Sequence, residues 1–306
     1  MRFLLINLFF FISCSSGTLS SQNQNKIIIA HRGASSYLPE HTLEAYAYAH
    51  AAGVDFIEAD VVLTADEVPI CLHDIYLEPT TNIEDIYPSR SRSDGHWYAI
   101  DFTLEEIKNL KVHERTHKNK RVFPNRFPLM KSSFQVPTFV EFIELIQGLN
   151  VATKSSIGIY PEIKKPEFHE KEGRNSKKII YDTIKKYGYE NRPDQIYIQS
   201  FHPETLIYLK SIGSSIPLVQ LIGDNSWGDS STDFNELKTQ NGLAEIKNYA
   251  NGVGVWLGHV KKDKSLVARA KKAGLIVHAY THRPESSNRG LHYYFSRLFL
   301  DGIFTD

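Results

Sequence analysis

Three acidic residues stand at the ends of apolar stretches, where carboxylates from separate strands can meet. Glu58 and Asp60 are two residues apart, so on a β-strand both side chains face the same side. Glu162 closes a second apolar stretch. Grouped carboxylates repel one another unless a cation lies between them. Because all three ligands are oxygens, the pattern predicts a site for a hard divalent cation, Ca²⁺ or Mg²⁺. An ion pair with a neighbouring cationic side chain, without a metal, is the competing interpretation.

Two histidines and two cationic residues end stretches of the same kind. His31 and His73 are candidates for general acid and general base, because histidine ordinarily titrates near neutral pH. Either residue could take either role. Arg32 offers a forked, permanently charged donor set for a phosphate, and Lys164 adds a second positive charge. Asp74 could orient a neighbouring imidazole or cap a turn. With a divalent cation, these groups indicate phosphoryl transfer.

A scaffold must bring these residues together, and apolar stretches that alternate with helical patterns indicate which one. Strands are predicted over 26–30, 55–60, 158–162, 195–200, 217–222, 252–256, 275–280 and 302–305. Helices are predicted over 42–52, 138–148, 174–187, 203–212, 243–250, 263–273 and roughly 284–299. We therefore expect an α/β fold, a TIM (β/α)₈ barrel, with its chemistry at the C-terminal ends of the strands.

The segment after the second predicted strand departs from this alternation. Residues 60–72 predict two extended arms around a turn near Asp66. The resulting hairpin is expected to place His73 roughly opposite Asp60. Residues from about 74 to 136 then form a long insertion. An insertion of this length beside an active face is expected to be a functional lid, with a small separate subdomain as the alternative.

The last predicted strand ends at Thr305, so no eighth helix is expected to follow it. In a (β/α)₈ barrel that helix covers the outer faces of the last and first strands. We therefore expect Ile27, Ile29 and Ile303, or their outward neighbours, to form an exposed apolar patch. Soluble monomers usually avoid such patches. Either the chain is truncated, or another segment, such as the N-terminal tether, or a partner subunit would have to cover the patch.

Composition and the N-terminal residues bear on where the protein works. Lys and Arg total 35, as do Asp and Glu, and this balance argues against a nucleic-acid partner. Arg2 and the short apolar stretch after it are typical of a signal peptide, expected over residues 1–13. Residues 11–14 are similar to a lipobox, which predicts acylation of Cys14. An ordinary cleaved signal peptide with an incidental cysteine is the alternative.

The domain organisation expected from these patterns is simple. Residues 14–25 are polar and predict a lipidated tether, and residues 26–306 form the barrel domain. We expect an exported bacterial lipoprotein that is periplasmic or surface-facing. It would touch the membrane only through its lipid anchor.

A series of short motifs surrounds the candidate residues in order along the chain: His31-Arg-Gly-Ala-Ser, Pro39-Glu-His-Thr-Leu-Glu-Ala, Glu58-Ala-Asp-Val, His73-Asp74, Tyr160-Pro-Glu-Ile-Lys164, Gln199-Ser-Phe201, Val277-His-Ala-Tyr-Thr281 and Asp301-Gly-Ile-Phe-Thr-Asp306. This series resembles the glycerophosphodiester phosphodiesterase family, from about Ile27 to the last residue. The long insertion is similar to that of the periplasmic or surface-lipoprotein branch. That branch acts on deacylated phospholipid head-group diesters and uses Ca²⁺.

The resemblance implies roles that agree with the chemistry argued above. It implies that His31 and His73 are the catalytic residues and that Arg32 binds the phosphate. The metal-binding positions that it implies are Glu58, Asp60 and Glu162. Phe201 and Tyr280 match positions that line the substrate pocket. His41 is expected to belong to a helix start capped by Thr42, rather than to the catalytic machinery.

We therefore expect a metal-dependent phosphoric diester hydrolase that acts on a small-molecule glycerophosphodiester. Its products would be an alcohol and sn-glycerol 3-phosphate. One alternative is lysophospholipase D or sphingomyelinase D-like cleavage of a head group in the same site. Another is a surface-binding lipoprotein on the same scaffold. The preferred alcohol and the oligomeric state are left open by the sequence.

Overall fold

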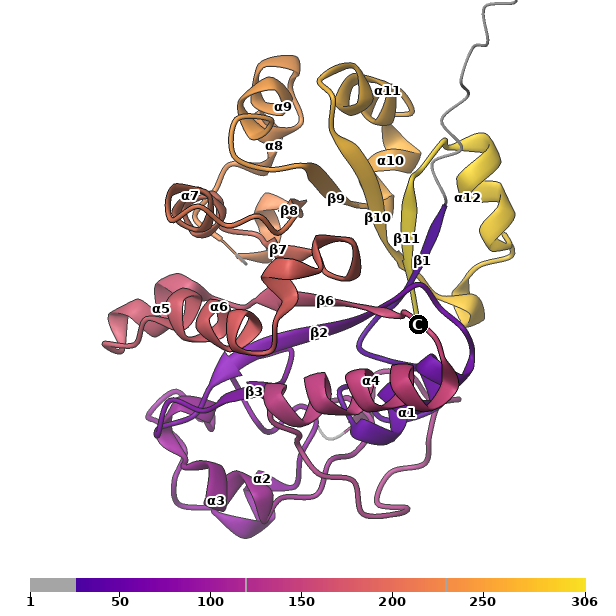
Figure 1. The fold of residues 1–306 in the computed structure, drawn as a ribbon. Coiled ribbons are helices and arrows are strands. Elements are labelled where there is room, and N and C mark those ends of the chain that lie inside the picture. Colours follow the sequence, from indigo (N-terminus) through magenta and orange to yellow (C-terminus); the bar gives the residue numbers. More distant parts are fainter. Residues whose placement is uncertain (1–25, 119, 229) are drawn as a thin grey trace, which may run out of the picture.

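A closed barrel of parallel strands forms the centre of the protein (Figure 1). The computed structural model describes residues 26–306 except 119 and 229. The expected signal peptide, Cys14 and the tether lie outside the described residues. The strands follow one another in the order β1-β11-β10-β9-β8-β7-β6-β2, and pairing of β1 with β2 closes the ring. The expected TIM barrel is confirmed, with its strands at β1 (Ile27–Ala30), β2 (Phe56–Leu63), β6 (Gly158–Ile163), β7 (Ile198–Ser200), β8 (Leu218–Ile222), β9 (Gly252–Trp256), β10 (Ile276–His282) and β11 (Gly302–Thr305).

Helices surround the barrel. They are α1 (Leu43–Ala51), α4 (Phe139–Thr153), α5 (Pro166–Lys171), α6 (Ser176–Lys186), α7 (Pro203–Ser211), α8 (Phe234–Leu237), α9 (Gln240–Ile246), α10 (Leu257–Lys262), α11 (Ser265–Lys272) and α12 (Leu291–Arg297). Each of the seven predicted helices overlaps one of them, whereas the short helices α5, α8 and α10 were not predicted. The helix predicted over 284–299 is wrong in length, because serine, asparagine and glycine before Leu291 favour turns. Within residues 26–306, apart from 119 and 229, no helix is long and apolar enough to cross a bilayer.

Side-chain caps determine where the helices beside the barrel rim begin. Thr42 precedes α1, and its hydroxyl accepts a hydrogen bond from Ala45 N at 3.2 Å, as expected for an N-cap. Thr138 and Glu141 form a reciprocal capping box at the start of α4. Both helices are thereby fixed directly after the segments that lead out of the active face.

The second strand continues past the barrel rim and folds back as predicted. β2 pairs antiparallel with β3 (Pro69–Cys71), and Glu67 in the turn has a φ of +61°. Leu72 N donates to Asp60 O at 3.0 Å. His73 therefore follows directly after the residue that lies opposite Asp60. The predicted hairpin is confirmed, and it carries His73 to the mouth of the barrel.

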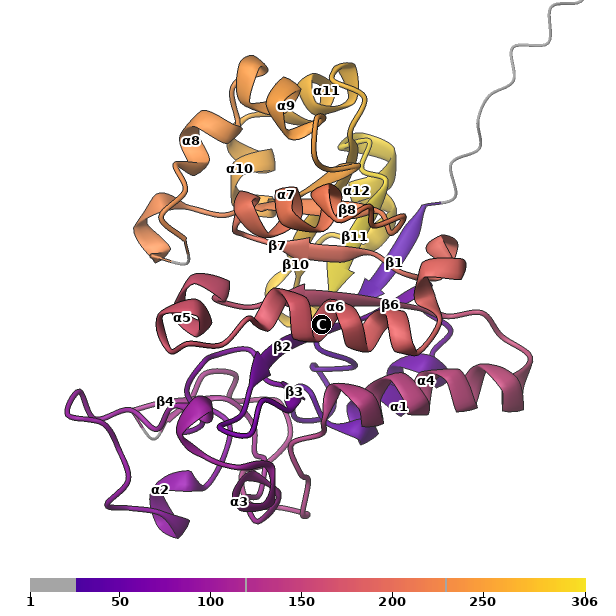
Figure 2. The ribbon, with the colours of Figure 1, turned by 60° about the vertical axis from the view of Figure 1, so that its left-hand side comes forward.

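The long insertion packs as a small body on the outer side of this hairpin (Figure 1, Figure 2). It contains α2 (Ile83–Ile86), α3 (Leu104–Lys108), β4 (Thr116–His117) and β5 (Lys120–Arg121). Its buried apolar residues, Trp97 and Phe102 among them, form a cluster with Val62 and Ile70 of the hairpin. None of its described residues lines the cavity at the barrel mouth. The structure thus agrees with the subdomain alternative, and the expectation of a lid is wrong.

The seam between the first and last strands is better covered than expected. Ile29 points into the barrel, where it packs in a cluster with Phe56, Tyr160, Val219 and Phe304. Ile303 lies in the main core with residues of α12, which covers it from outside. Both isoleucines are fully buried, while Ile27 is partly buried. The expected exposure of Ile29 and Ile303 is therefore wrong, although among the described residues no helix follows β11.

Candidate active site

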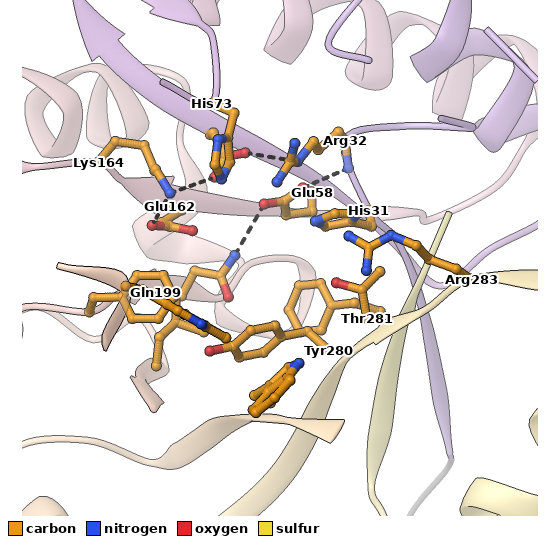
Figure 3. Close-up of a pocket in the computed structure, with 16 residues that line it drawn as sticks. His31, Arg32, Glu58, His73, Glu162, Lys164, Gln199, Tyr280, Thr281 and Arg283 are labelled. Carbon is orange, nitrogen blue, oxygen red and sulfur yellow. Dashed lines mark hydrogen bonds and ion pairs between the residues drawn. The ribbon is translucent and has the colours of Figure 1, made fainter. Parts of the chain in front are cut away.

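A cavity of about 290 Å³ opens at the C-terminal ends of the barrel strands (Figure 3). All of the site residues predicted within the described part of the chain line it. Its full lining is His31, Arg32, Glu58, Asp60, His73, Glu162, Lys164, Gln199, Phe201, Leu221, Trp227, Trp256, Tyr280, Thr281, Arg283 and Phe304. One half of this lining is charged and the other half is mostly aromatic.

The three carboxylates are brought together by the register of the barrel strands. Asp60 and Glu162 are direct partners on β2 and β6, and Glu58 lies two residues before Asp60. Burial, reinforced by Asp60, raises the pKa of Glu58 well above its ordinary value. Burial likewise raises the pKa of Glu162 to about 8, although Lys164 opposes it. Burial acts in the same direction on Asp60, but Lys164 and His73 outweigh it and lower its pKa. The cluster therefore holds protons that a bound cation would displace.

The donor set fits a hard divalent cation. Asp60 Oδ1 is buried and accepts no hydrogen bond, and the Lys164 ammonium lies 3.7 Å away. Gln199 also has a buried Oε1 without a hydrogen-bond partner, while its Nε2 donates to Glu58 Oε1 at 3.5 Å. Buried oxygens without partners are costly. A cation bound among these oxygens would remove that cost.

His41 lies behind the carboxylates and not in the cavity. Its ligand atoms, with those of Glu58 and Asp60, all lie within 4.8 Å of one another, which is compatible with a metal ion. However, His41 Nε2 lies 2.8 Å from Asp60 Oδ2, and its Nδ1 lies 2.7 Å from Tyr46 Oη. Both ring nitrogens are thus engaged, and His41 is not part of the cavity lining. His41 orients Asp60 from behind, so Glu162, which faces the cavity, is the better third ligand.

His31 is held at Nδ1 by a carboxylate from the last residue of the chain. Its Nδ1 lies 2.5 Å from Asp306 Oδ1. Because an ionised carboxylate only accepts, Nδ1 carries the hydrogen and Nε2 is the basic nitrogen. Burial, with Arg32 adding to it, lowers the pKa of His31 to about 4. The imidazole is therefore neutral at pH 7.

His73 is held in the same manner from the other side of the site. Its Nδ1 lies 2.8 Å from Asp74 Oδ1, so Asp74 contacts the neighbouring imidazole, one of the two roles considered for it. Burial, with Arg32 and Lys164 adding to it, lowers the pKa of His73 to about 4. Two neutral imidazoles, each fixed at Nδ1, thus line one cavity.

Arg32 and Lys164 place positive charge directly beside the carboxylates. Arg32 N donates to Glu58 Oε2 at 2.6 Å, and its guanidinium Nη1 donates to Glu40 Oε1 at 3.0 Å. The backbone at Arg32 has a φ of +58°, a conformation that costs energy for a non-glycine residue and turns the chain sharply after β1. Lys164 Nζ lies 2.9 Å from Glu162 Oε1. Both cations line the cavity, where they can meet an anionic group.

The far side of the cavity is aromatic. Figure 3 shows Tyr280 across the cavity from Lys164 and His73. The Tyr280 hydroxyl donates to Ile222 O at 3.0 Å, which fixes the ring. Trp227 and Trp256 meet edge to face with ring centroids 5.2 Å apart. The site thus combines a charged half suited to a phosphate with an apolar half suited to carbon atoms.

The sequence matches the glycerophosphoryl diester phosphodiesterase family over residues 31–306. The chain belongs to this family. It is 38% identical to a glycerophosphodiester phosphodiesterase of Haemophilus influenzae, over 89% of this chain and 84% of that protein. It is 32% identical to a glycerophosphodiester phosphodiesterase of Treponema pallidum, over 85% of this chain and 82% of that protein. These matches confirm the expected family and its class of enzyme, the phosphoric diester hydrolases.

Solved structures share the fold. A putative glycerophosphoryl diester phosphodiesterase from Silicibacter pomeroyi superposes with a TM-score of 0.71 at 24% identity, and covers 92% of this chain and 90% of that one. An Oleispira antarctica phosphodiesterase, solved in complex with the product sn-glycerol-3-phosphate, gives a TM-score of 0.64 at 22% identity. It covers 91% of this chain and 92% of that one. The barrel architecture of the glycerophosphodiester phosphodiesterases is therefore present here.

Some residues of this phosphodiesterase site were not predicted. Trp256 and Thr281 lie at or beside the C-terminal ends of β9 and β10, so the same strand-end argument could have found them. Trp227 ends the short 3-10 helix Asn225–Trp227 and Arg283 follows β10 directly, and no local pattern marks either residue. Asp306 was quoted only as part of a motif, although it contacts His31 directly.

Proposed function

We propose that this member of the family hydrolyses glycerophosphodiesters to an alcohol and sn-glycerol 3-phosphate, with a divalent cation held by Glu58, Asp60 and Glu162. Carboxylate oxygens suit both Ca²⁺ and Mg²⁺. Ca²⁺ is the proposed ion, because the resemblance to the periplasmic or surface-lipoprotein branch implies it, and Mg²⁺ is the alternative. The observation that carries the proposal is one cavity that joins these buried carboxylates to two carboxylate-held histidines. When bound, the cation would supply positive charge that offsets the charge on the phosphate oxygens.

The cationic side chains bind the substrate in this proposal. Arg32 and Lys164 line the charged half of the cavity and would contact the non-bridging phosphate oxygens. The aromatic half, with Phe201 and Tyr280, would contact carbon atoms of the diester. A phosphodiester would therefore bind with its anionic group toward the carboxylate-bound cation and its organic part toward the rings.

The two histidines divide the two proton transfers. One neutral imidazole takes a proton at Nε2 from the attacking oxygen, which belongs either to water or to the glycerol hydroxyl of the substrate. In the second case a cyclic phosphate forms first and water then opens it. The other imidazole, once protonated, gives a proton to the leaving oxygen. Both imidazoles have a pKa of about 4 because burial and neighbouring cations disfavour the charged form. An anionic phosphate bound beside the imidazole acts in the opposite direction and raises its pKa. Binding of the substrate thus favours the protonated imidazole that acts as the general acid.

Comparison of two choline diesters tests the substrate class. We expect purified protein to release sn-glycerol 3-phosphate from glycerophosphocholine at least tenfold faster than it cleaves lysophosphatidylcholine, about 1.4 kcal/mol in the barrier. Faster turnover of lysophosphatidylcholine would favour the lysophospholipase D alternative. Failure to turn over either diester would favour a surface-binding lipoprotein.

We propose in addition that the protein is exported and anchored through an acylated Cys14. The support is the short apolar stretch and the lipobox-like residues 11–14, followed by a polar tether. The native protein should then partition into the detergent phase, and Cys14→Ala should appear in the aqueous phase as an active enzyme. An intact mass that shows an unacylated N-terminus would contradict the anchor.

A further inference from the structure

The insertion reaches the active site through two arginines that the proposed mechanism does not use. Arg115 and Arg126 both lie within residues 74–136, and their side chains are 16% and 5% exposed. Neither lines the cavity. Each instead donates to a carboxylate that contacts one of the two histidines. The insertion thus touches the catalytic groups indirectly, from behind.

Arg115 provides the contact on the His73 side. Its Nη1 donates to Asp74 Oδ2 at 2.6 Å, while Asp74 Oδ1 lies 2.8 Å from His73 Nδ1. The same guanidinium donates through Nε and Nη2 to both oxygens of Glu40, at 2.9 and 2.6 Å. Asp74 therefore has one oxygen on the arginine and the other on the imidazole. Its carboxylate plane cannot rotate without losing one of these contacts.

Arg126 provides the matching contact on the His31 side. Its Nη2 donates to Asp306 Oδ2, while Asp306 Oδ1 lies 2.5 Å from His31 Nδ1. The guanidinium is itself fixed, because Nε donates to Glu285 Oε1 at 2.9 Å and Nη1 donates to Ser35 O at 3.2 Å. The order arginine, aspartate, imidazole is the same on both sides of the cavity, and we call these two series the Asp74 arm and the Asp306 arm.

We propose that Arg115 and Arg126 are positioning residues, through which the insertion holds both catalytic imidazoles in the orientation that the reaction needs. The inference rests on the acid and base roles proposed above for the two histidines. By occupying one oxygen, each arginine keeps the other oxygen of its aspartate on Nδ1. This contact fixes the tautomer and turns Nε2 toward the substrate, as outer partners of functional histidines commonly do.

Charge supports the same arrangement. Burial would raise the pKa of Asp74, but Arg115 and His73 outweigh it and hold that pKa well below its usual range. Burial is likewise outweighed at Asp306, whose pKa is lowered by His31, Arg283 and Arg126. Both aspartates are therefore ionised and able to accept from Nδ1. Arg115 lies 41 residues from its aspartate and Arg126 lies 180 residues from its own, so only the folded insertion completes the site.

The test measures kcat and KM for variants of each arm on two leaving groups. The variants are Asp74→Asn, Asp306→Asn, Arg115→Lys and Arg126→Lys, and the substrates are glycerophosphocholine and the p-nitrophenyl ester of glycerol 3-phosphate. Arg92→Ala is the matched control, since Arg92 is an arginine of the insertion that pairs with Asp101 and Glu172 and contacts neither histidine. Circular dichroism and Tm establish that each variant is folded.

With glycerophosphocholine, we expect the asparagine variants to lose about 10–10³-fold in kcat, with KM within about twofold, because a misplaced imidazole slows chemistry more than binding. The lysine variants should lose less than the asparagine variants but more than about twofold, because lysine keeps the charge and lacks the forked donor set of arginine, and Arg92→Ala should match the wild type. Lysine variants that keep the wild-type kcat would show that the aspartates hold the imidazoles without the arginines. When the P–O bond to the leaving oxygen breaks, its electron pair goes to that oxygen. Choline then needs a proton from the imidazolium Nε2, whereas p-nitrophenolate leaves without one. The arm that serves the general acid should therefore recover on the p-nitrophenyl ester, and the other arm should not.

Other results would overturn the inference in distinguishable ways. If His31→Ala and His73→Ala are inactive but both asparagine variants keep kcat within twofold, the arms do not position the imidazoles. If both asparagine variants lose equally on the two substrates, their role is structural support of the fold. If the two alanine variants stay active, the acid and base assignment itself fails, whatever the arms do.

Discussion

Removal of the proposed cation should make the stability of this protein depend on pH, because the pKa of Glu162, like that of Glu58, is raised in the folded protein. Burial raises the pKa of Glu162 from 4.5 to about 8. In the metal-free folded protein this carboxyl keeps its proton at pH values where the unfolded chain has released it. Between pH 4.5 and about 8 the folded state thus binds more protons than the unfolded state. The free energy of unfolding therefore falls as the pH rises through this interval.

The size of the effect follows from the same pKa. One pKa unit corresponds to about 1.4 kcal/mol, so the rise at Glu162 amounts to about 5 kcal/mol across the whole interval. For a domain of this size about 1 kcal/mol shifts Tm by about 2 °C, which gives a fall of about 10 °C. Ca²⁺ would displace the proton from Glu162, and it stabilises the folded state because only that state binds the ion. Protons compete less with Ca²⁺ at high pH, so the increase in Tm on addition of Ca²⁺ should be larger at pH 8 than at pH 5.5.

Thermal unfolding in EDTA and in excess Ca²⁺, each at pH 5.5 and pH 8, measures this effect. Glu162→Gln is the matched control, because it keeps the shape of the side chain without a titrating group. We expect the chelated wild type to lose stability at pH 8 and the glutamine variant to show a flatter profile with little gain from Ca²⁺. The same pH dependence in both chelated proteins would refute the reasoning.

Two further predictions concern the site and the barrel. His31→Ala and His73→Ala should each lower kcat by about 10²–10⁴-fold with the fold retained, and a His73→Ala enzyme within twofold of the wild type would show that the hairpin does not deliver a catalytic group. Gly158→Ala should destabilise the protein by about 1–3 kcal/mol, because the added Cβ would lie 2.3 Å from the Phe56 ring and 2.8 Å from Gln195 O. An unchanged midpoint in urea unfolding would show that this part of the barrel can relax.

The barrel and the charged half of the site could be predicted because they depend on patterns of neighbouring residues in the sequence. Strand ends bring side chains to one rim, so Glu58, Asp60 and Glu162 follow from the strand boundaries alone. The hairpin that delivers His73 is visible as two extended arms around a turn. In each case the residues that carry function are adjacent to the pattern that places them.

The rest depends on contacts between distant segments, which no local pattern shows. The position of Ile29 inside the barrel depends on the register of closure, and the burial of Ile303 depends on how α12 packs. The insertion looked like a lid because of its length, whereas its apolar residues bind it to the hairpin. Its two arginines reach the site only through the tertiary fold, 41 residues from Asp74 and 180 residues from Asp306.

A cation held by Glu58, Asp60 and Glu162 is proposed to enable cleavage of the diester. The most direct measurement is release of sn-glycerol 3-phosphate from glycerophosphocholine by protein whose metal content has been determined, before chelation, after chelation and after addition of Ca²⁺. We expect release to stop in the metal-free protein and to return with Ca²⁺, and we expect Glu162→Gln to recover little. Full activity in a preparation verified to be free of metal would contradict it.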